Sequence, residues 1–223
     1  MKLLARKVKG QSNFQTNKCL LSYINPHAAI AAEYRAIRNH IECTSDNNKL
    51  RSLIITSPST REGKTTATVN LAISKAQHGE KILIIDANMR NPKIHHIFQT
   101  NIAPGLANVL AGECTLIDVI NQTKISNLDI LPIGMLLNNA MEDIDSSLMD
   151  DLLSMVTTQY DCVLIDSAPV LDALNTNKLA SKCDGIILVL SSGKTQNESA
   201  LKAKRSLEFF SRAKIVGVIV NNS

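Results

Sequence analysis

One polar stretch of the sequence decides the fold, and it reads Ser57-Pro58-Ser59-Thr60-Arg61-Glu62-Gly63-Lys64-Thr65-Thr66. An apolar run typical of a buried strand, 52–56, precedes it, and a segment with helical spacing of apolar residues, at about 65–78, follows it. Gly-Lys-Thr between a strand and a helix is typical of a phosphate-binding loop, because backbone N–H groups of the loop and of the first helical turn point at one anion. We therefore predict a nucleotide site here.

The residue types in this stretch suit a nucleotide phosphate. Gly63 lets the backbone approach the phosphates, Lys64 reaches the β and γ oxygens, and the Thr65 hydroxyl can ligate Mg²⁺. The predicted phosphate-binding set also includes Thr60, Arg61, Glu62 and Thr66. The usual pattern has a glycine where this sequence has Pro58. A tight turn with an exposed lysine therefore stays open as the alternative.

Two further apolar runs end in an aspartate, at Asp86 and Asp166. Because the carboxyl ends of parallel strands meet at one edge of a sheet, we expect both carboxylates to lie close to Lys64. A carboxylate beside a triphosphate can ligate Mg²⁺ or accept the proton of an attacking hydroxyl group. Taken singly, either aspartate could equally well begin a turn.

The rest of the chain alternates between apolar runs and helical patterns. The runs are 52–56, 82–86, 128–132, 161–166, 185–190 and 215–220, and the helical segments are near 65–78, 105–111, 115–121, 145–158, 173–182 and 196–211. Short runs rich in Ile, Val and Leu without alternation are typical of strands buried on both faces. We predict an α/β fold of the P-loop NTPase type, with a mostly parallel central sheet, helices on both faces and an N-terminal helical extension at 28–43.

Charge divides the chain into two parts. It has 223 residues and a formal net charge of +4, but residues 1–18 carry five basic residues and no acid, so the remainder sums to −1. We therefore predict a basic arm, 1–24, and a nearly neutral nucleotide-binding domain, 25–223. The arm either contacts an anionic lipid or acidic partner or is a solvated terminus. Few aromatic residues and a neutral domain argue against nucleic acid as a partner. Five cysteines without a CxxC pair favour a reducing compartment.

Five motifs occur along the chain in a characteristic order. They are Tyr34-Arg35-Ala36-Ile37-Arg38, the loop 56–66, the segment 82–92, the segment 160–169 and the last apolar run, 217–221. In this order they resemble the bacterial tyrosine kinases of capsular and exopolysaccharide synthesis, in their cytoplasmic-domain form. The resemblance extends over nearly the whole chain, from Asn25 to Asn221, and it implies a P-loop ATPase fold related to the cell-division and plasmid-partition ATPases.

The resemblance implies an activity, which is transfer of the γ-phosphoryl group of ATP to a protein tyrosine with Mg²⁺ as the metal. By this resemblance, Lys64 neutralises the phosphates, Thr65 and Asp166 hold Mg²⁺, and Asp86 contacts the metal or accepts the tyrosine proton. Further residues carried over from the family are Arg90 near the reacting phosphate, Asn221 by the adenine, and Glu33, Arg35 and Arg38 for oligomerisation. The family also implies a transmembrane adaptor of the polysaccharide chain-length class and a cytoplasmic location at the inner face of the plasma membrane.

The sequence departs from the family pattern at several positions. Asn88 stands where the family has a second aspartate, Thr60-Arg61 stands where Pro-Gly is usual, and Glu33 is one residue late. We expect weaker catalysis from Asn88 and from the lack of the family's tyrosine-rich tail after Ser223. The alternatives are a catalytically degenerate ATP-binding regulatory paralogue of the same assembly system and, less favoured because a second signature lysine is missing, a partition-type ATPase.

Overall fold

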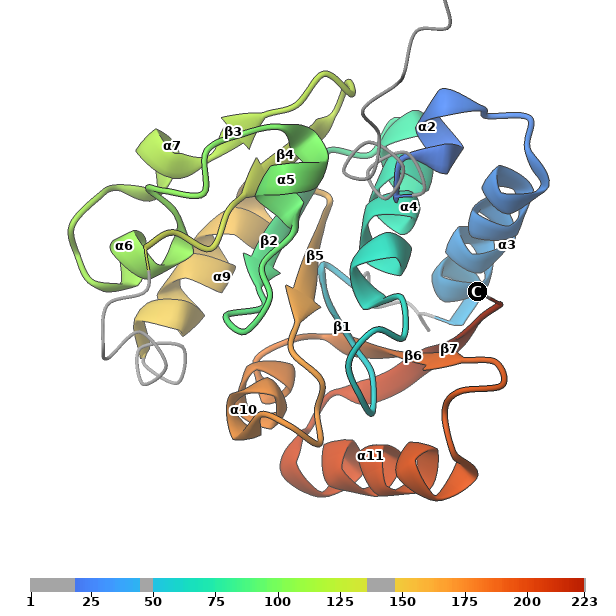
Figure 1. The fold of residues 1–223 in the computed structure, drawn as a ribbon. Helices are drawn as coiled ribbons and strands as arrows, with labels where there is room; N and C mark the ends of the chain where they lie inside the picture. Colours follow the sequence, from blue (N-terminus) through green and yellow to red (C-terminus); the bar gives the residue numbers. More distant parts are fainter. Residues whose placement is uncertain (1–18, 45–49, 136–146, 223) are drawn as a thin grey trace, which may run out of the picture.

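The computed structural model describes residues 19–44, 50–135 and 147–222, which form one sheet of seven strands in the order β3-β4-β2-β5-β1-β6-β7 (Figure 1). The strands are β1 (Ser52–Thr56), β2 (Ile82–Ala87), β3 (Asn121–Gln122), β4 (Leu128–Leu131), β5 (Cys162–Ser167), β6 (Gly185–Ser191) and β7 (Lys214–Asn221). β3 is antiparallel to β4, and every other neighbouring pair is parallel. The predicted α/β fold is confirmed.

Helices cover both faces of the sheet, as Figure 1 shows for α4 on one side and α9 on the other. The helices are α2 (Leu21–Ile24), α3 (Ala29–Thr44), α4 (Lys64–Gln77), α5 (Ile94–Phe98), α6 (Leu106–Leu110), α7 (Leu116–Val119), α9 (Ser147–Gln159), α10 (Leu174–Ser181) and α11 (Asn197–Phe210). Along β1, Leu53 and Ile55 join the apolar cluster under α3, α4 and α5, while Ile54 joins the opposite cluster under α6, α7, α9, α10 and α11. Successive side chains of β1 thus enter apolar clusters on opposite faces of the sheet. Neither face of this strand is therefore left for polar residues.

Three short elements differ from the sequence prediction. The helix predicted at 115–121 ends at Val119, because Asn121 pairs with Ile130 of β4 and so begins the edge strand β3. The helices α5 and α2 were not predicted, since their five and four residues are too short to show helical periodicity. In the part of the chain that the structure describes, no helix has the length and hydropathy needed to cross a bilayer.

The end of the predicted arm, from Cys19 to Ile24, packs along the nucleotide-loop helix α4. Asn70 of α4 is the main contact, because its amide group donates to the carbonyl oxygen of Cys19 at 3.0 Å and accepts from the N–H of Ser22 at 3.1 Å. The Sγ atom of Cys19 lies 3.4 Å from the hydroxyl oxygen of Thr66 in the first turn of α4. Residues 19–24 are therefore held against the helix that begins at the phosphate loop.

The helix α3 carries the three residues that the family resemblance assigns to oligomerisation. Arg38 is buried, and its guanidinium group donates to the carbonyl oxygen of Ser74 in α4 at 3.0 Å. Glu33 and Arg35 are exposed, and Arg35 donates to the carbonyl oxygen of Pro26 at 2.9 Å. Arg38 thus joins α3 to α4 within one chain, while the assembly role of the three residues stays a prediction.

Replacing Arg38 by alanine should destabilise the fold much more than the same change at Arg35. The change R38A leaves the buried carbonyl of Ser74 without its charged donor, which costs about 1–3 kcal/mol in unfolding free energy. Arg35 is exposed on the same helix and gives the matched control. The change R35A should lower the unfolding free energy by less than about 0.5 kcal/mol. Urea unfolding of both variants measures the difference, and equal losses would contradict the role assigned to Arg38.

Candidate active site

The phosphate loop joins the end of β1 to the start of α4 at the carboxyl edge of the sheet. Gly63 has a positive φ of 95°, and no side chain of the described residues caps the first turn of α4, so the N–H groups of this turn are available to an anion. Asn221 of β7 covers the loop, because a Cβ atom added to Gly63 would lie 2.3 Å from its side-chain nitrogen. A residue larger than glycine would therefore meet both strain and a clash at position 63.

Lys64 folds back over the loop that precedes it. Its side chain is buried, and its ammonium group donates to the hydroxyl oxygen of Ser57 at 3.1 Å. Burial lowers the pKa of Lys64, while the carboxylates of Asp166 and Glu62 act in the opposite direction. Lys64 and Asp166 therefore lie close enough for their charges to interact, as expected from the sequence.

Asp166 at the end of β5 offers an oxygen atom for a metal ion. Its Oδ2 accepts a hydrogen bond from the Thr65 hydroxyl at 2.6 Å. Its Oδ1 is buried and has no hydrogen-bond partner among the described residues. A buried carboxylate oxygen without a partner is costly unless a cation binds it. Thr65 and Asp166 therefore fit the hard oxygen ligands that Mg²⁺ prefers.

Asp86 has a different environment from the one that the sequence prediction implied. It accepts three backbone hydrogen bonds of 3.1 Å each, from Asn88 on Oδ1 and from Lys93 and Ile94 on Oδ2. These bonds order the loop after β2 and fix the start of α5. Asp86 thus organises the loop, and its predicted roles as metal ligand or proton acceptor stay predictions.

Asp86 and Asp166 are paired in register on the neighbouring strands β2 and β5. Both are completely buried, at 0% exposure. Burial raises the pKa of each carboxyl group above its ordinary value, and the charge of Asp166 raises the pKa of Asp86 further. The site therefore disfavours two negative charges at once unless a cation is bound.

The loop after β2 also contains Asn88, one of the residues that depart from the family pattern. Asn88 is buried, and its side-chain oxygen accepts from the N–H of Asn91 at 3.3 Å. Arg90 is exposed and borders a small hollow shared with Ala87 and Ser167. Arg90 therefore lies beside the strand ends that carry the two aspartates, with its side chain exposed.

Two residues that sequence analysis missed contact the phosphate loop from the loop between β6 and α11. Lys194 donates to the carbonyl oxygens of Thr60 and Arg61, and the hydroxyl group of Thr195 donates to Glu62. These pairs are separated by 133 or 134 residues, so no local pattern in the sequence predicts them.

The three tyrosines of the chain differ in exposure. Tyr34 and Tyr160 are 7% and 5% exposed, and the phenol of Tyr160 donates to Asp129 at 2.9 Å. Burial raises the pKa of both phenols. Tyr23 on α2 is 43% exposed, so it is the one tyrosine of this chain whose ring is open to a second protein.

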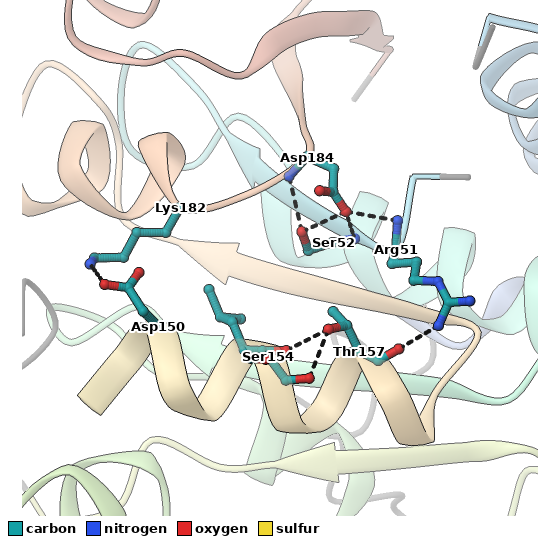
Figure 2. A pocket seen from close by; sticks show the side chains of 8 residues that line it. Arg51, Ser52, Asp150, Ser154, Thr157, Lys182 and Asp184 are labelled. Carbon is teal, nitrogen blue, oxygen red and sulfur yellow. Dashed lines mark hydrogen bonds and ion pairs between the residues drawn. The ribbon is translucent and has the colours of Figure 1, made fainter. Parts of the chain in front are cut away.

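A hollow at the opposite, amino edge of the sheet is built from internal polar contacts (Figure 2). Asp184 accepts from the backbone N–H groups of Arg51 and Ser52 at 2.9 and 2.8 Å, and Lys182 forms an ion pair with Asp150 at 2.7 Å. Figure 2 shows Lys182 directed at Asp150 on one side of the hollow and the carboxylate of Asp184 directed at Ser52 and the backbone of Arg51 on the other. Because open parallel sheets bind ligands at their carboxyl edge, we assign these contacts to stability.

The sequence is similar to a known domain family and to named bacterial tyrosine-protein kinases. Residues 61–207 match the AAA domain family. Tyrosine-protein kinase YwqD of Bacillus subtilis (strain 168) is 35% identical over 216 residues, which cover 97% of this chain and 90% of that protein. The putative tyrosine-protein kinase CapB of Staphylococcus aureus is 32% identical over 88% of this chain and 86% of its own length.

Solved structures show the same fold. The chimerical protein CapA2B2 has a TM-score of 0.87 and 31% identity, covering 92% of this chain and 90% of that chain. The kinase domain of the Escherichia coli tyrosine kinase ETK also has a TM-score of 0.87, with 27% identity over 91% of this chain and 79% of that chain. The septum site-determining protein MinD of Pyrococcus horikoshii OT3, complexed with Mg-ADP, has a TM-score of 0.63 over 74% of this chain and 67% of that chain. The predicted P-loop ATPase fold is therefore confirmed.

The stability of the nucleotide-free protein should fall as the pH rises from about 4, the ordinary carboxyl pKa, to about 7, the value to which burial raises the pKa of Asp86. In this range the folded state binds more protons than the unfolded state, so the unfolding free energy decreases with pH. Each unit of pKa shift corresponds to about 1.4 kcal/mol. Urea unfolding across this range in the presence of EDTA measures the slope.

The change D166N provides the control, because asparagine can still accept from Thr65 but does not titrate. It also removes the neighbouring charge that raises the pKa of Asp86. The pH slope of D166N should therefore be clearly smaller. An identical slope in the two proteins would exclude the aspartate pair as its source.

Proposed function

The chain belongs to the AAA-domain family and, within it, to the bacterial tyrosine-protein kinases, and we propose that it transfers the γ-phosphoryl group of ATP to a protein tyrosine. The observation that carries this proposal is the meeting of three groups at one edge of the sheet. They are the uncapped first turn of α4, the ammonium group of Lys64 and the unpartnered oxygen atom of Asp166. Together they offer a site for the phosphates and for Mg²⁺.

Binding of ATP would use groups that the loop already presents. The N–H groups from Gly63 to Thr66 would surround the β-phosphate, and Lys64 would exchange its bond to Ser57 for the phosphate oxygens. Asn221 covers Gly63, and by the family resemblance it would lie by the adenine. Phosphoryl transfer depends on such positioning and on neutralising charge more than on covalent catalysis.

Transfer of the phosphoryl group would need a second set of residues. Thr65 and Asp166 would hold Mg²⁺, which when bound neutralises charge on the phosphates. Asp86 has a raised pKa, and a carboxylate with a pKa near neutrality is suited to accept the proton of a tyrosine hydroxyl. The exposed Arg90 would move toward the γ-phosphate and stabilise the charge that develops there.

The cellular role follows from the family resemblance. We propose that the protein regulates polymerisation and export of a capsular polysaccharide or exopolysaccharide, and that a transmembrane adaptor of the chain-length class activates it at the inner face of the plasma membrane. The exposed Glu33 and Arg35 are available to a second copy of the chain, whereas Arg38 would first have to leave Ser74. The basic arm, 1–24, would add affinity for anionic lipid.

The kinase proposal is tested with purified protein, ATP, Mg²⁺ and a tyrosine-containing acceptor peptide, with and without the cytoplasmic part of the adaptor. The wild-type protein should transfer phosphate to tyrosine, and K64M should lose at least about 100-fold in rate, because a charged donor to the transferred group is removed. Mapping of phosphopeptides should find phosphate on the acceptor or on the exposed Tyr23, but not on Tyr34 or Tyr160. Binding of ATP that K64M abolishes, without any transfer, would overturn the kinase proposal.

The second candidate function is an ATP-binding regulatory subunit without kinase activity. Asn88 favours it, since an amide replaces the family's second aspartate beside the strand that carries Asp86. If the protein is a weakened kinase, N88D should raise the rate of transfer by about tenfold, which corresponds to 1.4 kcal/mol of transition-state stabilisation. N88A serves as the control for loss of the bond to Asn91. No gain in N88D would favour the regulatory function.

A further inference from the structure

The sequence contains Gly-Lys-Thr a second time, at 193–195, in the loop between β6 and α11. In this copy the lysine binds backbone carbonyl groups. The ammonium group of Lys194 donates to the carbonyl oxygen of Thr60 at 2.8 Å and to that of Arg61 at 3.1 Å. The second Gly-Lys-Thr therefore holds the loop that contains the first.

The backbone of Arg61 explains why the loop needs such a contact. Arg61 has a φ of 60°, in the left-handed region that residues with a Cβ atom rarely adopt. The family usually has glycine at this position, and glycine adopts this conformation freely. The side chain of Arg61 is exposed, so packing of this side chain in the core does not hold the positive φ. The conformation has to be stabilised from outside the loop.

Lys194 acts on the two peptide groups that surround this φ angle. In a planar trans peptide the C=O and N–H groups point in opposite directions. A cation that binds the carbonyls of Thr60 and Arg61 on one side therefore directs the N–H groups of Arg61 and Glu62 to the other side. Consecutive N–H groups that point to one side form the concave arrangement that binds phosphate.

Thr195 supports the same arrangement at the next residue. Its hydroxyl accepts from the N–H of Ser191 at 2.8 Å and donates to Oε1 of Glu62 at 2.7 Å. The other carboxylate oxygen of Glu62 accepts from the N–H of Ser59 at 2.9 Å. Two adjacent residues of the β6–α11 loop thus contact three consecutive residues of the phosphate loop.

We propose that Lys194 is a positioning residue for ATP binding, which compensates for an arginine at the glycine position of the phosphate loop. It holds Thr60 and Arg61 in the conformation that binds phosphate, and it acts through the loop. This proposal rests on the proposed ATP site, but the loop conformation can be measured without nucleotide. It predicts that Lys194 is needed because position 61 is not glycine.

The test is a double-mutant cycle of K194M, R61G and the combined variant, with K202M as the matched control. Lys202 lies on α11 and forms an exposed ion pair with Glu198 at 2.7 Å, away from the phosphate loop. In calorimetric titration, K194M should bind MgADP about tenfold more weakly, since a charge-assisted contact to the loop is lost. The combined variant should stay within about twofold of R61G, because glycine needs no support at positive φ.

Two further measurements distinguish a positioning role of Lys194 from a general loss of stability in K194M. The melting temperature of nucleotide-free K194M should equal that of K202M, and its KM for ATP should rise at nearly constant kcat. An equal loss of MgADP affinity in the arginine and glycine backgrounds, or no loss in K194M, would overturn the proposal.

Hydrogen exchange in the nucleotide-free protein gives a reading that does not depend on kinase or nucleotide function. The reporter is the amide of Ser59, which donates to the carboxylate of Glu62 inside the loop. Its exchange should be faster in K194M and should return to the R61G rate in the combined variant. If the wild-type protein bound no nucleotide, the proposed function would fail, while this exchange reading would still support or overturn the role of Lys194.

Discussion

The site is governed by two buried carboxylates that stand side by side on neighbouring strands. Asp86 and Asp166 are fully buried and in register on β2 and β5, and such charges are stable only with donors or cations around them. Asp86 obtains three backbone N–H groups, which shapes the loop from Asn88 to Ile94. Asp166 obtains the Thr65 hydroxyl and keeps one oxygen unpartnered. Asp86 thus orders the loop after β2, and Asp166 keeps a buried oxygen atom that, among the described residues, has no hydrogen-bond partner.

The order of the strands explains how distant parts of the chain reach one loop. β1 lies between β5 and β6, so the phosphate loop that follows it has Asp166 on one side and the β6–α11 loop on the other. β7 extends the same edge and brings Asn221 over Gly63. The proposed nucleotide site therefore depends on the order of the strands, because the loop alone would lack its contacts with Asp166, Lys194 and Asn221.

The sequence predicts those parts of the structure that depend on neighbouring residues. The buried runs, the Gly-Lys-Thr loop and the aspartates at strand ends follow from short patterns and from the rule that parallel strands share an edge. The start of α5 was missed because Asp86 fixes it from a preceding strand. The buried contact of Arg38 with Ser74 was missed because it joins two helices. Lys194 was missed because its partners are more than a hundred residues away.

The position of β1 also determines when, during translation, the proposed nucleotide site can form. Both neighbours of β1 in the sheet come more than a hundred residues after it, since β5 begins at Cys162 and β6 at Gly185. A ribosome that has made only the phosphate loop and α4 has made no strand to flank β1. Because folding waits for such distant pairings, the nascent chain cannot build the proposed nucleotide site until β5 and β6 have been synthesised.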